Sequence, residues 1–238
     1  MFGLRTKLVI IVMCNLIAAA KASSQLTVSL YNDAEIPRST LQRAEEVAGR
    51  IYLQAGITIE WQDGTGPLSS EKIADSSEGA GSSVTLRIVS RPRTLSGEDF
   101  GIAFVGDDGR PQQADVFFAS IEHFRETSSA SISAILGHVM AHELGHLLLG
   151  QKSHSETGIM QARWEGPQLR QLSMGALRFG KHESERIRNR LSNPNFPRPT
   201  AQTRSEGAEK VSVDLGFSGR VAVHRCDSRF DLNCGLRV

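Results

Sequence analysis

The stretch SISAILGHVMAHELGHLLLG, residues 131–150, does most to decide the fold. Apart from three histidines and one glutamate, it consists of apolar and small residues over a length typical of a long helix. Ser131 or Ser133 is a good N-cap, and Gly150 can end the helix. We therefore expect a buried helix over residues 131–149, with other elements packed around it.

The segments before this helix predict a series of strands and one further helix. Runs rich in β-formers predict strands at residues 26–31, 57–61, 84–89, 100–105 and 115–118. An approximate stripe of apolar residues predicts a helix between Pro37 and Gly56, and the Gly- and Ser-rich residues 62–83 predict a surface loop. Beyond the central helix, residues 167–175 and 182–191 are expected to be helical.

The order of these elements predicts an α+β (mixed α/β) fold. With 39% hydrophobic and 22% charged residues, the chain has the composition of a globular protein. A strand–helix–strand opening favours a twisted, mostly parallel sheet with an edge strand and with helices packed on it. The helices after the central one would form a small helical C-terminal subdomain. We expect one domain over residues 23–191, followed by a polar linker and tail over residues 192–238.

Within the central helix, His142, Glu143 and His146 have the spacing of a zinc site. Residues four apart lie on one face of a helix, about 6 Å apart along its axis, so both imidazoles can direct a nitrogen at one zinc ion. Glu143 points beside that face, where it can hold and deprotonate a zinc-bound water. His138 is also in register, but it lies about 12 Å from His146 along the axis. We therefore expect His138 to be a packed or hydrogen-bonded neighbour.

A catalytic zinc usually takes three protein ligands, so a third must come from a segment that turns back. Gly150 can adopt the left-handed conformation that breaks the helix, and His154 follows four residues later. His154 is therefore our preferred third ligand. The alternatives are Glu183 or Glu185 and, less convincingly, Glu156, Glu165 and His182.

The pattern from His142 to Met160 resembles the motif of the metzincin clan of zinc endopeptidases, HExxHxxGxxH followed by a methionine-containing turn. The present sequence reads HExxHxxxGxxxH, which is one residue longer than the family pattern at two places. The resemblance extends to the order of elements over residues 26–191. It implies that Met160 packs beneath the metal ligands and does not bind the metal.

The residues and the resemblance together predict a hydrolase, a zinc metallopeptidase with one catalytic Zn²⁺ ion. Glu143 would take a proton from water and pass it to the leaving amine. The metal ligands would be His142, His146 and His154. In the clan, an extended peptide pairs with an edge strand over the zinc. The corresponding residues in this sequence are Gly101, Ala103 and Phe104.

Two other functions fit the same residues. A secreted zinc-binding module without turnover would have no need of Glu143. A zinc amidohydrolase would act on a small or cell-wall peptide, and a closed pocket would favour it over an endopeptidase. The non-functional alternative is a helix that carries histidines but binds no metal.

The N-terminal residues predict export. Arg5 and Lys7 precede an apolar run over residues 8–20, and small residues flank Lys21, which together are typical of a signal peptide over residues 1–22. Its removal takes three of the 27 basic residues and none of the 26 acidic ones, which leaves a net charge of about −2. We therefore expect a secreted, extracellular or periplasmic protein without a nucleic-acid partner or a stable membrane anchor.

The remaining expectations concern the assembly and the tail. We expect a monomer whose partners are protein or peptide substrates. Cys226 and Cys234 could close a hairpin in the tail in an oxidising compartment.

Overall fold

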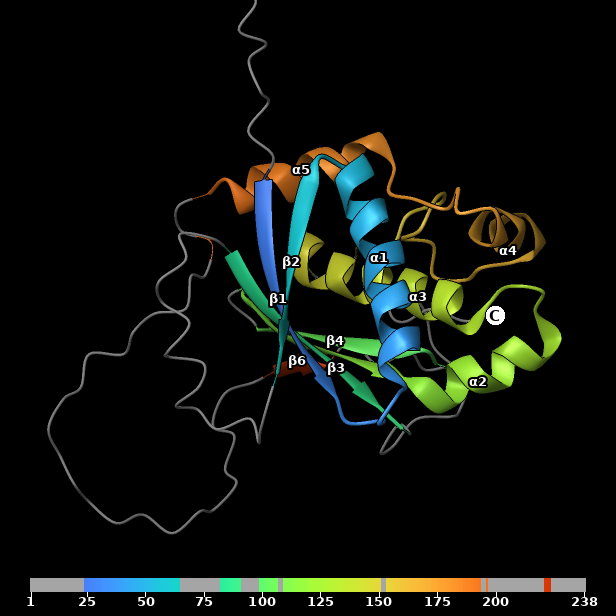
Figure 1. The fold of residues 1–238 in the computed structure, drawn as a ribbon. Helices are drawn as coiled ribbons and strands as arrows, with labels where there is room; N and C mark the ends of the chain where they lie inside the picture. Colours follow the sequence, from blue (N-terminus) through green and yellow to red (C-terminus); the bar gives the residue numbers. More distant parts are fainter. Residues whose placement is uncertain are drawn as a thin grey trace, which may run out of the picture.

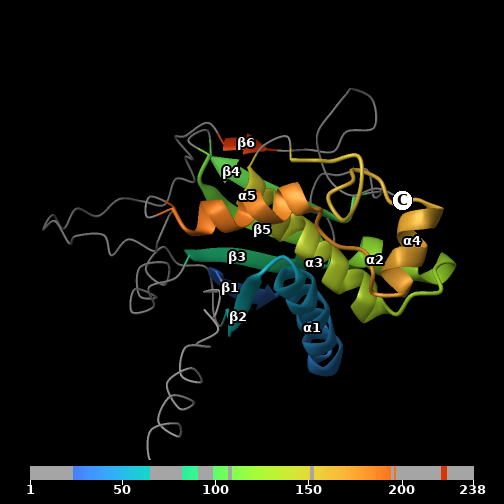
Figure 2. The same cartoon turned by 90° about the horizontal axis from the view of Figure 1, so that it is seen from above.

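The computed structural model describes residues 24–64, 82–90, 99–106, 109–150, 153–193, 196 and 221–223. Within these residues a six-stranded sheet has the strand order β2-β1-β3-β5-β4-β6 (Figures 1 and 2). The expected signal peptide, most of the loop expected over residues 62–83, and Cys226 and Cys234 lie outside the described residues.

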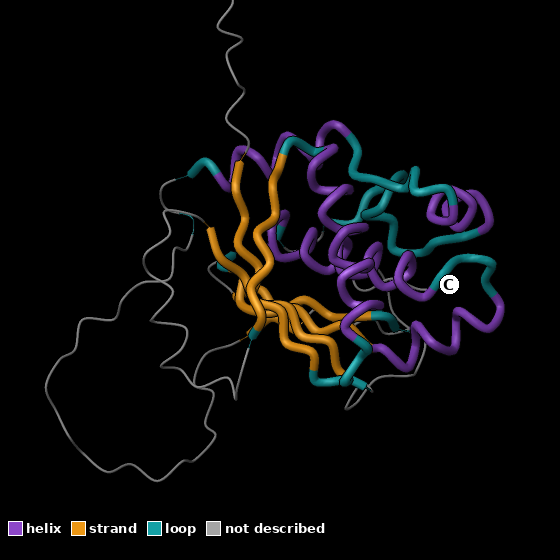
Figure 3. The backbone as a smooth tube through the Cα atoms, in the orientation of Figure 1, coloured by secondary structure: helices purple, strands orange, loops and turns teal. Residues whose placement is uncertain are grey.

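Along the described part of the chain, one helix follows the first strand, four strands and then four helices come next, and a short strand is last. Figure 3 shows the strands gathered in one layer with the helices beside them. The strands are β1 (Ser24–Asn32), β2 (Ile57–Asp63), β3 (Ser82–Val89), β4 (Gly101–Gly106), β5 (Pro111–Phe117) and β6 (Val221–Val223). The helices are α1 (Arg38–Gln54), α2 (Phe118–Thr127), α3 (Ile132–Leu149), α4 (Gly166–Ser173) and α5 (Lys181–Leu191).

The sheet is mostly parallel. β1 pairs in parallel with β2 and β3, and β3 pairs in parallel with β5. β4 and β6 add two antiparallel pairings. Alternate residues are buried along the two central strands, which shows that the helices cover one apolar face of the sheet. These buried residues are Leu26, Val28 and Leu30 of β1 and Val84, Leu86 and Ile88 of β3.

The helix α3 lies at the centre of the fold. Its N-cap is Ser131, whose hydroxyl accepts a hydrogen bond from the backbone N–H of Ala134, and it ends at Gly150, which has a φ of 85°. It contacts the other four helices and three strands, and Figures 1 and 2 show it beside α1. Among the described residues, α3 is the one helix long and apolar enough to cross a membrane, but it is mostly buried inside the protein, as a core helix is.

The predicted fold class is confirmed, and the boundaries of most elements agree with the prediction to within a few residues. One helix was missed. We expected Phe118 to belong to a strand, but it begins α2, on which Phe118, Ile121 and Phe124 recur every third residue. This helical spacing was obscured by the β-forming pair Phe117-Phe118.

The start of β5 was also placed too late. We expected this strand from residue 115, but β5 already begins at Pro111. A proline is tolerated at the first residue of a strand, where its missing N–H is not needed for pairing. The parallel pairing of Gln113 with Thr85 of β3 then extends the strand towards the turn.

β4 is not the outermost strand, which corrects the prediction for residues 100–105. β6 pairs with its outer edge, where Phe104 lies opposite Val223 and Gly106 opposite Val221. The sequence could not show this because β6 lies more than one hundred residues further along the chain. The rest of the predicted tail hairpin lies outside the described residues.

Candidate metal centre

Three histidines converge at the C-terminal half of α3. The ring nitrogens that His142, His146 and His154 offer lie within 4.8 Å of one another. Nε2 of His142 and Nε2 of His146 are 2.9 Å apart. The ring centroid of His154 lies 5.5 Å from that of His142 and 4.7 Å from that of His146. These histidines form a group that can hold a metal ion, and we call it the three-histidine group.

α3 and the segment after it position the three rings. His142 and His146 are one helical turn apart on α3 and therefore share a face. The helix ends at Gly150, whose φ of 85° lies in a region that residues with a Cβ rarely adopt. The chain then brings His154 back to the helix. The two residues by which this sequence exceeds the metzincin motif therefore do not keep His154 away from the other two histidines.

Hydrogen bonds hold the two helical histidines in orientation. Nδ1 of His142 donates to the carbonyl oxygen of Ile159 over 2.7 Å. Because a carbonyl oxygen only accepts, this bond places the ring proton on Nδ1 and leaves a lone pair on Nε2. Nδ1 of His146 lies 2.7 Å from Oγ of Ser153. Partners of this kind fix the orientation of metal-binding imidazoles.

Burial keeps His142 neutral. The pKa of His142 lies at about 3, below its ordinary value of 6.5, because burial disfavours the charged ring and His154 adds repulsion. The hydrogen bond to Ile159 raises the pKa again, but by less than burial lowers it. His142 is therefore neutral at neutral pH, which is the form that binds a metal ion.

The donor set fits zinc. In a tetrahedral site with zinc–nitrogen distances of about 2.0–2.1 Å, two imidazole nitrogens lie about 3.4 Å apart. The 2.9 Å between the two Nε2 atoms and the 4.8 Å limit for the whole group bracket this value. Three histidines also leave one position for water or a substrate, as catalytic zinc sites do.

Met160 packs directly against the turn of α3 that carries the histidines. It is buried, and a Cβ at Gly145 would lie 2.6 Å from its sulfur, so only glycine allows this approach. The backbone N–H of Ser155 donates to the carbonyl oxygen of Met160 over 2.9 Å, which closes residues 155–160, directly after His154, into a compact loop. Met160 therefore packs against α3 at Gly145, the residue before His146.

Glu143 is a buried carboxyl group next to His142. Neither of its oxygens has a hydrogen-bond partner among the described residues. Burial raises the pKa of Glu143 well above its ordinary value, and the carboxyl groups of Asp99 and Asp115 raise it further. A buried carboxyl group of this kind costs stability and is typical of functional sites.

Gly101 of β4 makes room for Glu143. A Cβ at Gly101 would lie 2.7 Å from both Cγ and Cδ of Glu143 and 2.8 Å from the carbonyl oxygen of Asp115. No side chain other than hydrogen fits at this position without displacing the glutamate or the backbone. The predicted substrate strand therefore lies directly against the predicted general base.

Two acidic residues near Glu143 were not predicted from the sequence. Asp99 is fully buried just before β4, and Asp115 lies on β5 opposite Ile102 of β4. Gln113 donates a hydrogen bond from Nε2 to Asp115 Oδ1 over 2.7 Å. In the sequence, each of these aspartates is next to or within a run of β-forming residues. Nothing in either run shows that the pairing of β4 with β5 brings both carboxyl groups close to α3.

The other candidate ligands lie apart from the three-histidine group. His182, Glu183 and Glu185 belong to the first turns of α5, and neither Glu156 nor Glu165 joins the group. His138 is buried and its Nδ1 donates to the carbonyl oxygen of Ala134 over 2.7 Å, so the expectation of a hydrogen-bonded neighbour is confirmed.

The predicted substrate residues have three different surroundings. Gly101 contacts Glu143, and the side chain of Ala103 is buried. Phe104 lies opposite Val223 of β6, so the outer edge of β4 is already paired there. Among the described residues, the stretch of β4 that has no partner strand on its outer side runs from Gly101 to Ala103.

Comparison with known proteins adds little to this geometry. No family model and no curated protein matches the chain. Among solved structures, the crystal structure of archaemetzincin from Methanopyrus kandleri is similar to 74% of this chain and to 100% of that chain, with 18% sequence identity and a TM-score of 0.41. A similarity at that level assigns neither a family nor an activity, so the function has to be inferred from the three-histidine group and Glu143.

Proposed function

We propose that this protein is a zinc-dependent peptidase that is exported and hydrolyses peptide bonds in protein or peptide substrates. The observation that carries the proposal is the position of the buried, unpartnered carboxyl group of Glu143 beside three convergent histidines. A site that only stored or transported a metal would gain nothing from such a carboxyl group, whose burial is costly.

His142, His146 and His154 would hold one zinc ion. Zinc held there would act as a Lewis acid that polarises the substrate carbonyl and acidifies water. The bonds from Nδ1 of His142 to Ile159 and from Nδ1 of His146 to Ser153 keep the Nε2 atoms of both rings directed at one point.

Glu143 would move the proton. Its carboxylate accepts a proton from the attacking water at one oxygen and delivers it to the nitrogen of the leaving amine. Burial and the nearby Asp99 and Asp115 favour the protonated form of Glu143, which can deliver a proton to the leaving amine. The positive charge of a bound metal would favour the ionised form of Glu143, which can accept a proton from water.

The substrate would add a strand to β4 beside Gly101. Main-chain hydrogen bonds along Gly101–Ala103 would align an extended peptide without strong sequence preference. Because a Cβ at Gly101 would strike Glu143, a peptide paired with Gly101 would lie beside the general base.

A second candidate function has one specific observation in its favour. β6 pairs with β4 from Phe104 to Gly106, which shortens the edge available to a long peptide. A zinc amidohydrolase that acts on a small or cell-wall peptide would need only the shorter stretch.

Turnover by a Glu143→Gln variant distinguishes an enzyme from a zinc-binding module. Zinc-loaded wild type and variant are incubated with a peptide library, and the products are identified by mass spectrometry. We expect cleavage by the wild type and a loss of about a thousandfold or more in the variant, with zinc content unchanged, because glutamine has the same shape but accepts no proton.

The matched control is Glu185→Gln, an exposed carboxyl group on α5 outside the three-histidine group. It should retain full activity. Cleavage at the wild-type rate by Glu143→Gln would show that Glu143 is not the general base. Cleavage confined to short peptides would favour the amidohydrolase.

A further inference from the structure

A polar cavity lies between α1, α3 and the end of α4, away from the three-histidine group. Its volume is about 500 Å³, within the range of small-molecule sites. None of the three metal-group histidines lines it. Trp164 packs against one histidine of each site, since its ring centroid is 6.3 Å from that of His138, which lines the cavity, and 5.9 Å from that of His142.

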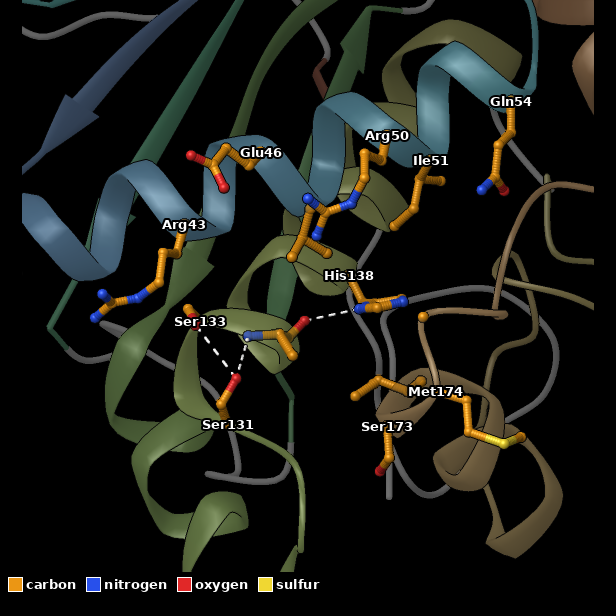
Figure 4. Close-up of a pocket in the computed structure, with 14 residues that line it drawn as sticks. Arg43, Glu46, Arg50, Ile51, Gln54, Ser131, Ser133, His138, Ser173 and Met174 are labelled. Carbon is orange, nitrogen blue, oxygen red and sulfur yellow. Dashed lines mark hydrogen bonds between the residues drawn. The ribbon is translucent and has the colours of Figure 1, made fainter.

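The wall of this cavity holds a buried hydrogen-bond acceptor. His138 is 1% exposed, and its Nδ1 donates to the carbonyl oxygen of Ala134. The ring proton is therefore on Nδ1, and Nε2 carries a lone pair that has no partner among the described residues. Figure 4 shows the ring projecting from α3 towards the end of α4. A ligand with an N–H or O–H group would satisfy this acceptor.

Positive charge exceeds negative charge around the cavity. Arg43 and Arg50 lie two turns apart on α1, and neither forms a hydrogen bond or ion pair with another described residue. Glu46 is the one carboxylate among the described lining residues. The N-terminus of α3, with Ser131 at its cap, opens into the same space and adds a partial positive charge (Figure 4). This side of the cavity suits an anion.

The remaining wall is apolar. Val47 and Ile51 of α1 and Leu172 of α4 line this part of the cavity. Met174 lines it with a side chain that is 72% exposed, one of two large apolar side chains that are exposed in the described part of the chain. A ligand body with a branched aliphatic group would bury this surface.

We propose that this cavity binds the carboxylate end of an N-acylated amino acid with an apolar side chain, the chemistry that the C-terminal residue of a peptide presents. The carboxylate faces Arg43 and Arg50, the acyl N–H donates to Nε2 of His138, and the side chain packs against Ile51 and Leu172. The three features of the cavity thus match three groups on one carbon atom of the ligand. This site stands independently of the proposed peptidase activity.

The test uses the full-length, zinc-loaded protein labelled with ¹³C at its methionine methyl groups. N-acetyl-leucine is titrated, and the methyl signals of Met174 at the cavity and Met160 at the three-histidine group are followed by NMR. We expect a saturable shift of the Met174 signal and none of the Met160 signal. A shift of the Met160 signal alone would place the ligand at the metal site and overturn the proposal.

Two further probes test the chemistry. N-acetyl-leucinamide lacks the carboxylate, and 4-methylpentanoic acid lacks the N–H, so each should bind at least about tenfold more weakly than N-acetyl-leucine. The peptide acetyl-Ala-Ala-Leu should bind at least as well as N-acetyl-leucine. Equal affinity for N-acetyl-leucine and N-acetyl-leucinamide would show that the cavity does not recognise the carboxylate. Failure of acetyl-Ala-Ala-Leu to bind would show that the cavity does not take the C-terminal residue of a peptide.

Variants test the residues. Arg43→Ala/Arg50→Ala should abolish the preference for the acid over the amide, whereas Arg125→Ala/Lys181→Ala removes the same charge elsewhere and should change nothing. His138→Phe should abolish the preference for N-acetyl-leucine over 4-methylpentanoic acid. If His138→Phe fails to fold, the double arginine variant and the binding of the probes to the wild type still test the proposal. Unchanged preferences in the arginine variant would overturn the proposal.

Discussion

The carboxyl group of Glu143 lies directly against the α-carbon of Gly101, where a Cβ would come within 2.7 Å of Cδ of Glu143. This contact joins the central helix to the strand β4 at the point where the proposed chemistry takes place. It also explains why a glycine stands at the start of a strand whose other residues are apolar.

Gly101→Ala should therefore impair turnover without removing the metal. The added methyl group displaces the carboxyl group of Glu143, and we expect activity to fall about a hundredfold while zinc content is unchanged. Activity assays and elemental analysis of the same sample measure both. Gly49→Ala on α1 is the control, because a Cβ there meets nothing closer than 4.0 Å. Equal activities of the two variants would show that the contact has no role.

Ser153→Ala should weaken metal binding. Oγ of Ser153 is the partner of Nδ1 of His146, and the loss of such a partner typically lowers metal affinity by about 10–100-fold. Competition with a zinc chelator measures the change. Ser155→Ala is the control in the same loop, since among the described residues its hydroxyl donates to the carbonyl oxygen of Thr157 and to no metal-group histidine. An affinity equal to that of the wild type in Ser153→Ala would mean that the ring of His146 is held by other contacts.

The metal-free protein should lose stability in acid through His142. Its pKa is about 3 in the folded state and 6.5 ordinarily, so between these pH values the unfolded chain binds a proton there that the folded chain does not. The contribution of His142 to the free energy of unfolding is therefore fully present above pH 6.5. It falls as the pH decreases, and at pH 4.5 it is lower by about 3 kcal/mol.

Urea unfolding at pH 7 and pH 4.5 measures this loss, and His142→Gln isolates it. Glu143 acts in the opposite direction, because its raised pKa means that stability is lost as the pH rises above its ordinary value. Since Glu143 is present in both proteins, the difference between wild type and variant reports His142. Identical pH dependences would contradict the assignment of a neutral, buried ring.

Removal of residues 197–238 should increase activity on long peptides. β6 pairs with β4 at Phe104–Gly106, next to the stretch where the substrate would add a strand. Without β6 an extended peptide could pair along all of β4, so we expect a lower KM for long peptides and no change for dipeptides. A KM that is unchanged for both would show that β6 and the substrate do not compete.

The sequence predicted the centre of the fold well because its signals were local. The cap at Ser131, the glycine at position 150 and the four-residue spacing of His142 and His146 each depend on neighbouring residues. The same holds for the parallel opening β1–α1–β2, whose helix ends before Gly56 at a φ of 78°.

The features that the sequence did not show depend on contacts between distant segments. Asp99 and Asp115 reach Glu143 only because β4 pairs with β5, and the outer edge of β4 is partly paired only because β6 returns from the tail. The position of His138 in the wall of a cavity likewise depends on how α1, α3 and the end of α4 pack together. No periodicity or local motif encodes such contacts.

The most direct test of the account is the zinc content of the purified protein, measured by elemental analysis for the wild type and for His154→Ala, with Glu183→Ala and Glu185→Ala as controls. We predict one zinc ion per chain in the wild type and in both controls, and its loss or a much weaker affinity in His154→Ala. Zinc retained at full affinity in His154→Ala, or a wild type that binds none after reconstitution, would contradict the three-histidine centre.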